Sequence, residues 1–360
     1  MLLVLISYMI AIGNACCPTP NAKTGSSTAK TPVSMKCGVP HVPPDVSIIE
    51  DYDDYEELPV TTSNETVKQE DSAKLIHYGQ PAIAHSWPWQ VLILTYRYAM
   101  AHSLCGGSII DAHHVLTAAH CVDDWFTYRH QERLSEFIKV HVGMHDTSQI
   151  FPNHSQFTDG LYQPDRVVMH PLWNRRHLFN DVALLHFEQP IEFNDNVMPI
   201  CLPGTPVQSG DRCFTSGWGY TDKQPGLEFY RGPLQQAPIF ARSLAAGECP
   251  WPAFSHYPQF AKISEKFKQD AEAVMFCGEG TKASTCQGDS GGPVMCEKNG
   301  VWSLQGMVSH GFKANLSSGS FCESYSMTMY ANVSYFLPWI QENRRTFQGD
   351  KKVVQKNVEL

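Results

Sequence analysis

Three short segments of the 360-residue chain contain the residue types that nucleophilic catalysis requires. Ser290 lies in the sequence Gly-Asp-Ser-Gly-Gly-Pro (288–293), His120 follows Leu-Thr-Ala-Ala, and Asp181 stands at the head of an apolar run. A serine hydroxyl is a poor nucleophile until a base removes its proton. An imidazole base must in turn be held in one tautomer by an acid. The segments therefore predict acyl transfer with Ser290 as nucleophile, His120 as base and Asp181 as acid.

The glycines around Ser290 predict a binding site for the negative charge that develops on the substrate. Glycines on both sides of the serine allow the backbone to approach a scissile carbonyl closely. The N–H groups of Gly288 and Ser290 can then point at the developing oxyanion.

The pattern of the chain around these residues indicates an all-β fold. From Ile76 to about Arg345, short β-rich runs such as 89–94 are separated by Gly, Pro, Asn and Asp, which is typical of a barrel or sandwich. The sequence Phe-Leu-Pro-Trp-Ile-Gln-Glu-Asn (336–343) predicts a closing helix with Pro338 in its first turn.

Together these motifs resemble those of the chymotrypsin/trypsin family of serine proteases, in that family's order His, Asp, Ser. The resemblance runs from about Ile76 to Ile340. It implies two packed six-stranded antiparallel β-barrels with a C-terminal helix, the catalytic residues in the cleft between the barrels, and no cofactor. Further matching segments are 86–90, 105–108, 198–203, 216–219 and 330–333.

The twelve cysteines agree with this resemblance, which implies five disulfide bonds. The start of the chain around Cys37 resembles the family's pro-segment, whose first cysteine tethers it. A Cys37–Cys201 bond would therefore keep the pro-segment attached after activation. Cys16 and Cys17 remain, and they either bond each other or bond another chain. The implied pairs are Cys37–Cys201, Cys105–Cys121, Cys213–Cys296, Cys249–Cys277 and Cys286–Cys322.

The resemblance also implies how the protein is activated. Ile76 matches the new N-terminus of the family, and Asp289 matches the carboxylate that binds its ammonium group. The sequence Ile-His-Tyr-Gly (76–79) departs from the usual Ile-Val-Gly-Gly. A trypsin-like cut after Lys74 would begin the chain one residue early, and a cut after Leu75 would need a different activator.

The substrate pocket of the family corresponds here to four residues: Ser284 at the floor, Ser309, Gly311 at the mouth and Thr328 at the wall. A neutral floor leaves a cationic side chain without a partner, and Thr328 narrows a wall that is often glycine. We therefore expect a medium apolar residue such as Leu or Met before the scissile bond.

Two further features near the pocket depart from the family pattern. His310 replaces the usual tryptophan beside this pocket. The loops before Cys277 and before Cys322 are longer than usual in the family. The alternative to the expected specificity is that the loop before Cys322 reshapes the pocket.

The ends of the chain predict secretion. Residues 1–15 resemble a signal peptide, 16–75 form an acidic pro-segment rich in Pro, Ser and Thr, 76–345 form the protease domain, and 346–360 are a polar tail. The acidic stretch 49–57 is either a solvated linker or a docking tail. In a secreted, disulfide-bonded chain, four sequons become candidate glycosylation sites: Asn64, Asn153, Asn315 and Asn332.

Composition excludes other classes of function. The net charge of −9 without Lys/Arg clusters argues against nucleic acid as a partner. No cysteine or histidine spacing is typical of a metal site, and no later segment is apolar enough to cross a membrane. The expected partners are protein or peptide substrates, an activating protease and protease inhibitors.

Two rival functions remain. A catalytically silent homologue would act as a binding module, but its usual mark is a lost catalytic residue, and all three are present. A lipase or esterase would carry a Gly-x-Ser-x-Gly elbow and the order Ser, Asp, His, and this chain has neither.

Overall fold

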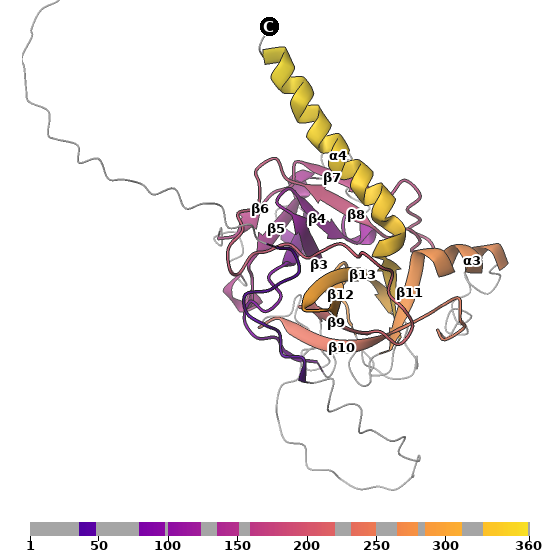
Figure 1. The fold of residues 1–360 in the computed structure, drawn as a ribbon. Coiled ribbons are helices and arrows are strands. Elements are labelled where there is room, and N and C mark those ends of the chain that lie inside the picture. Colours follow the sequence, from indigo (N-terminus) through magenta and orange to yellow (C-terminus); the bar gives the residue numbers. More distant parts are fainter. Residues whose placement is uncertain are drawn as a thin grey trace, which may run out of the picture. The chain divides into compact units, whose positions relative to one another are not determined.

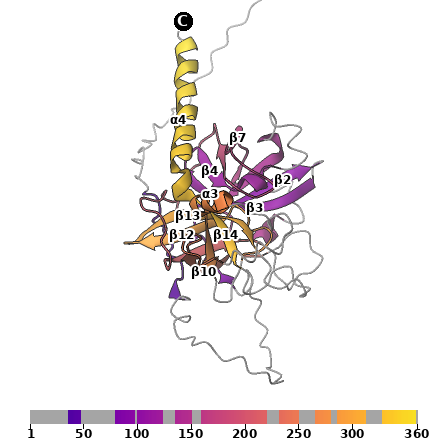
Figure 2. The same ribbon diagram turned by 90° about the vertical axis from the view of Figure 1, so that its right-hand side faces the viewer.

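The computed structural model describes residues 36–47, 79–97, 100–123, 135–150, 159–219, 232–249, 265–279, 285–311 and 327–358. These residues form two antiparallel β-sheets, followed by a C-terminal helix (Figures 1 and 2). The calls on Ile76, Ser284, Cys322, Asn64, Asn153 and Asn315 fall outside the described residues.

The first sheet contains seven strands and curls around the N-terminal half of the core. In sheet order they are β6 (Leu161–Tyr162), β5 (Ile138–Val142), β2 (Gln90–Arg97), β3 (Met100–Asp111), β4 (His114–Thr117), β8 (Ala183–His186) and β7 (Arg166–Met169). Every residue of β4 and of β8 is buried. These two strands pair with each other. His120 lies shortly after the end of β4, and Asp181 lies shortly before the start of β8.

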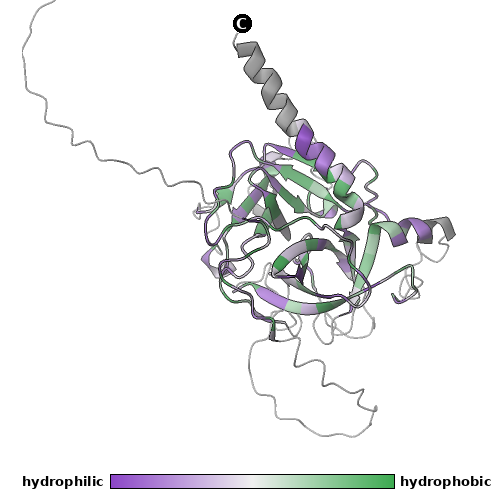
Figure 3. Ribbon diagram, in the orientation of Figure 1, coloured by the Kyte–Doolittle hydropathy of each residue, from purple (hydrophilic) through white to green (hydrophobic). Residues whose placement is uncertain are grey.

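The second sheet closes into a six-stranded barrel. Its sheet order is β10 (Gln235–Arg242), β11 (Met275–Glu279), β14 (Thr328–Asn332), β13 (Val301–Gly311), β12 (Pro293–Lys298) and β9 (Arg212–Gly217), and β9 pairs again with β10. The two-residue strand β1 (Gln80–Pro81) adds to the outside of β10. The expected all-β class is confirmed, with one closed six-stranded barrel and one curled sheet. In Figure 3 the strands of both sheets are mostly apolar.

Aromatic packing joins the two sheets. Trp87 packs edge-on against Trp302 of β13, with ring centroids 4.8 Å apart, and its indole N–H donates to Gln236 Oε1 on β10 at 2.7 Å. Trp89 and Phe214 are also fully buried within this cluster. Burial of such large rings stabilises the packing of one sheet against the other.

Four disulfide bonds lie within the described residues, and they are pairs that the resemblance implies: Cys37–Cys201, Cys105–Cys121, Cys213–Cys296 and Cys249–Cys277. Cys286 is disulfide-bonded as well. Hydrogen bonds hold the segment around Cys37, since Gly38 N donates to Pro199 O at 2.9 Å and Gly38 O accepts from Trp302 N at 2.8 Å.

The helices differ from the sequence-based expectation. Helix α4 spans Val333–Val358, so it begins earlier than predicted, continues through most of the polar tail, and places Pro338 inside the helix rather than in the first turn. Helix α3 (Glu265–Val274) lies in the long segment between Cys249 and Cys277. Neither described helix has the length and apolar content that crossing a bilayer requires.

Candidate active site

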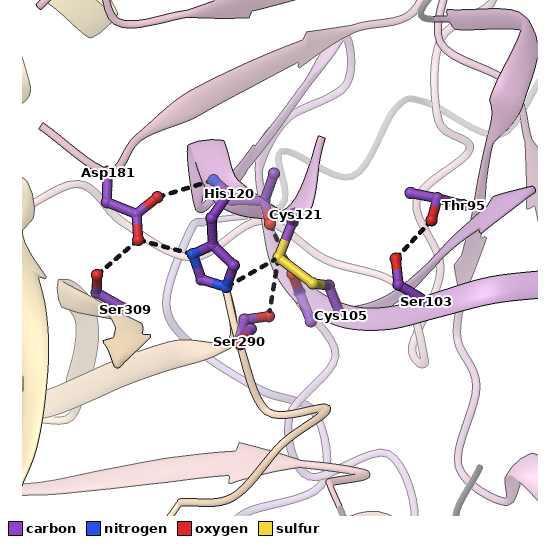
Figure 4. Close-up of a disulfide and its surroundings, with 10 residues drawn as sticks. Thr95, Ser103, Cys105, His120, Cys121, Asp181, Ser290 and Ser309 are labelled. Carbon is purple, nitrogen blue, oxygen red and sulfur yellow. Dashed lines mark hydrogen bonds and ion pairs between the residues drawn. A yellow bond between two sulfur atoms is a disulfide. The ribbon is translucent and has the colours of Figure 1, made fainter. Parts of the chain in front are cut away.

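A buried carboxylate holds the imidazole of His120 in one orientation. Asp181 Oδ2 lies 2.7 Å from His120 Nδ1, and Asp181 Oδ1 accepts the backbone N–H of His120 at 2.9 Å (Figure 4). The Asp181 side chain is 1% exposed, whereas His120 is 25% exposed. The ionised carboxylate can only accept, so Nδ1 carries the ring proton and Nε2 of the neutral ring is free to act as a base.

Local backbone structure fixes both residues. His120 lies in the short 3₁₀ helix η2 (Ala119–Cys121), directly after β4. Asp181 follows Asn180, which adopts the left-handed region with φ of 54°. The amide of Asn180 donates to Leu172 O at 2.9 Å, and its carbonyl accepts from Val182 N at 2.9 Å. Asparagine tolerates this conformation better than most residues, which explains its place before Asp181.

The two charges shift each other's protonation. Burial alone would lower the pKa of His120, but the charge of Asp181 and its hydrogen bond outweigh burial and raise the pKa above the ordinary histidine value. Burial alone would raise the pKa of Asp181, and the His120 charge together with the donated hydrogen bonds keeps it below its ordinary value. The carboxylate therefore stays ionised and stabilises an imidazolium next to it.

The segment that carries Ser290 is pressed against the first sheet. The carbonyl of Ser290 accepts from Gly106 N of β3 at 2.8 Å. Gly291 has φ of 74°, and a Cβ there would lie 2.2 Å from Thr117 Oγ1. Only glycine fits at this point, which accounts for the glycine that follows Ser290.

Ser290 lies on the Nε2 side of the His120 ring (Figure 4). Both residues contact the Cys105–Cys121 disulfide: His120 Nε2 lies 3.9 Å and Ser290 O 3.5 Å from Cys121 Sγ. A disulfide sulfur carries no proton, so these are packing contacts. No hydrogen bond joins Ser290 Oγ to His120 Nε2 in the described structure, and such bonds often tighten only when substrate binds.

Two backbone donors lie beside Ser290. The N–H groups of Gly288 and Ser290 donate to no other described residue, whereas the N–H groups of Asp289 and Gly291 are bonded to Cys286 O and Val308 O. Gly288 has φ of 103°, a conformation open to glycine alone. The two unused donors can stabilise a developing oxyanion.

The residue before Ser290, Asp289, carries a buried carboxylate. It is 1% exposed and accepts the N–H groups of Gly219 and Cys286, each at 2.8 Å. Burial raises its pKa to about 6. A Cβ at Gly217 or Gly219 would lie within 2.5 Å of the carboxylate, so the Ser-Gly-Trp-Gly motif makes room for it.

The described part of the expected substrate pocket contains a pair of hydroxyl groups. Thr328 Oγ1 lies 2.7 Å from Thr285 Oγ1, and both side chains are buried. Thr285 is not among the residues predicted for this pocket, although it directly follows the expected floor residue. A Cβ added at Gly311 would meet no described atom within 4 Å. Ser309 directs its hydroxyl at Asp181 Oδ2, 2.5 Å away.

One group of possible metal ligands occurs among the described residues, formed by Cys105, His120 and Cys121. The two sulfur atoms are joined in a disulfide, so neither can supply the thiolate that a metal would need. This group therefore fits no metal.

Comparisons with known proteins agree with this geometry. The family model described as Trypsin matches residues 76–340. Chymotrypsin-C of Mus musculus is 30% identical over 268 residues, which cover 73% of this chain and 87% of the relative. Chymotrypsin-C of Bos taurus is 30% identical over 271 residues with the same coverage. Human Transmembrane protease serine 5 is 31% identical over 272 residues, 73% of this chain and 50% of the relative. The chain belongs to the trypsin family of serine proteases, as its motifs predicted.

Proposed function

We propose that this protein is a secreted serine endopeptidase that hydrolyses peptide bonds through an acyl-enzyme on Ser290. The observation that carries the proposal is the buried Asp181 carboxylate, which fixes the tautomer of His120 beside Ser290. His120 Nε2 takes the proton of Ser290 Oγ as that oxygen bonds to the scissile carbonyl carbon. The imidazolium then returns the proton to the departing amine. Water, activated by His120, releases the acyl group and regenerates Ser290.

The N–H groups of Gly288 and Ser290 serve as the oxyanion hole in this proposal. This assignment is supported because neither N–H group donates a hydrogen bond to any described residue. A donor that is already oriented and unbonded costs no reorganisation when charge develops on the substrate oxygen.

The proposed specificity is for a medium apolar side chain before the scissile bond. The bonded hydroxyls of Thr285 and Thr328 would fill part of the wall. No described atom lies within 4 Å of a Cβ added at Gly311, which supports an open entrance. With Ser284 as an uncharged floor, a cationic side chain would lack a compensating charge. Leu or Met then fits better than Arg, Lys or a large ring.

The protein is proposed to be made as a zymogen. Asp289 is a buried carboxylate, and no described Lys, Arg or His pairs with it. An ammonium group created by cleavage before Ile76 would supply the missing positive charge. That pair would lower the carboxylate pKa and hold the Ser290 segment in its active shape.

The domain organisation and location complete the proposal: a signal peptide over 1–15, a pro-segment over 16–75, the protease domain over 76–345 and a polar tail over 346–360. Disulfide bonds fit an oxidising, extracellular compartment. An activating protease and protease inhibitors are the further proposed partners. Glycosylation is proposed at some of the four sequons rather than at every one. The amide nitrogen of Asn332 donates to Ala273 O at 3.5 Å.

The test is hydrolysis of a peptide library by the secreted, processed protein beside a Ser290→Ala protein processed in the same way. N-terminal sequencing of the active form locates the cleavage. We expect turnover by the wild-type chain and none by the variant. A wild-type chain that is cleaved before Ile76 yet hydrolyses no peptide would favour the silent homologue instead.

A further inference from the structure

A second histidine is connected to Asp181 through Ser309. His310 Nδ1 lies 3.1 Å from Ser309 Oγ, and Ser309 Oγ lies 2.5 Å from Asp181 Oδ2. The same carboxylate oxygen contacts His120 Nδ1 at 2.7 Å. One continuous path of hydrogen bonds therefore runs from His310 to the imidazole proposed as the catalytic base.

An irregularity in β13 creates this path. Val308 pairs with Tyr330 and His310 pairs with Met329, so Ser309 is an extra residue with no partner across the strands. In a regular strand, neighbouring side chains point to opposite faces. A β-bulge redirects side chains locally, and here Ser309 Oγ and His310 Nδ1 come within hydrogen-bonding distance of each other.

The positions of the protons along the path follow from Asp181. Its ionised carboxylate has no proton to give, so Ser309 must donate its single hydroxyl proton to Oδ2. Ser309 can then only accept from its other neighbour. His310 must therefore carry its ring proton on Nδ1 and donate it to Ser309 Oγ, which leaves Nε2 of the neutral ring unprotonated.

We propose that His310 is a positioning residue: its Nδ1–H fixes the direction of the Ser309 hydroxyl and thereby moderates how strongly Asp181 attracts the His120 proton. This inference rests on the proposed role of His120 as base. Hydrogen bonds in a chain polarise one another, so a donor behind Ser309 strengthens the bond from Ser309 to Asp181. A better-satisfied carboxylate holds an imidazolium less tightly.

The His310 ring stays neutral in the pH range in which His120 gains or loses its proton. Burial lowers its pKa to about 4, and the charged groups that act on it among the described residues are Asp181 and His120. Its ring therefore remains a neutral donor through the pH range in which His120 titrates.

The experiment is a histidine titration by NMR on the full-length Ser290→Ala chain, with the histidine rings labelled with ¹⁵N. At pH 7 the ¹⁵N shifts should show His310 protonated on Nδ1. His310→Phe and His310→Gln remove a donor from that position, and each should raise the pKa of His120 by about 0.3 or more, a fraction of one hydrogen bond. His310→Asn places an amide N–H near the same point and should leave the pKa within about 0.1 of the parent value.

A His310 ring protonated on Nε2 at pH 7 would overturn the proposal. So would equal His120 pKa values in the Gln and Asn variants, a comparison that still decides if the Phe variant does not fold. The titration needs no turnover, so a protein that hydrolyses no peptide would contradict the proposed function and leave this result intact.

Discussion

The Nδ1 atom of His120 lies 2.7 Å from Oδ2 of Asp181, a carboxylate that is 1% exposed. Asp181→Asn keeps the shape of this pair but removes the charge and presents an amide N–H to Nδ1. The ring proton should then move to Nε2, where it blocks attack by Ser290. We expect kcat for peptide hydrolysis to fall by about 10⁴, the loss known for this change in the family. An unchanged circular dichroism spectrum would show that the fold is retained.

Thr328→Gly should widen the substrate pocket. It removes the β-branched side chain and its bond to Thr285. The ratio of kcat/KM for Phe over Leu before the scissile bond should rise by about 10- to 100-fold, as apolar pockets discriminate by roughly 1–3 kcal/mol. Thr328→Ser keeps the hydroxyl and should change the ratio less. A clear preference of the wild-type protein for Arg or Lys would contradict the pocket assignment.

Asp289 should make the unprocessed chain less stable at neutral pH. Its pKa is raised from 3.8 to about 6, so ionisation opposes folding, and stability is lost as pH rises from about 4 to about 6. Asp289→Asn removes this ionisation. The free energy of unfolding of the variant minus that of the parent should therefore rise by on the order of 3 kcal/mol between pH 4 and pH 7. Urea unfolding of the unprocessed Ser290→Ala chain, with and without Asp289→Asn, measures this difference.

The same pH series on the processed protein supplies the control. Once an ammonium group pairs with Asp289, ionisation should no longer oppose folding, and the shift should disappear or reverse. Parallel stability curves for the parent and variant in the unprocessed chain would show that the carboxylate is not raised in pKa.

The Cys37–Cys201 bond should hold the pro-segment on the processed protein. A denaturing gel should show one species without reductant and two with it, whereas Cys37→Ser should show two in both lanes. The backbone contacts of Gly38 should keep the Cys37→Ser light chain associated in native buffer. Loss of the wild-type light chain without reductant would refute the tether.

The all-β class and the close packing around Ser290 and Asp289 could be predicted because each depends on local residue types. Ser290 with its glycines, and Asp289 beside Gly217 and Gly219, form motifs in which backbone proximity leaves no room for a Cβ. Such constraints are visible in a sequence because only one residue type satisfies them.

Other features depend on contacts that a sequence does not display. The bulge at Ser309 adds one residue to β13, and nothing in the residue types shows where a strand loses its alternation. Thr285 and Thr328 are 43 positions apart. The start of α4 at Val333 is not visible in the sequence because a proline is typical of the first turn of a helix, whereas Pro338 lies inside this one.

Covalent labelling of Ser290 tests the central assignment most directly. The processed protein is treated with a serine-directed phosphonate, digested, and its peptides are mapped by mass spectrometry. We expect one adduct on the peptide that contains Ser290, no adduct in Ser290→Ala, and greatly slowed labelling in Asp181→Asn. An adduct on another residue, or undiminished peptide hydrolysis by purified Ser290→Ala, would contradict this assignment.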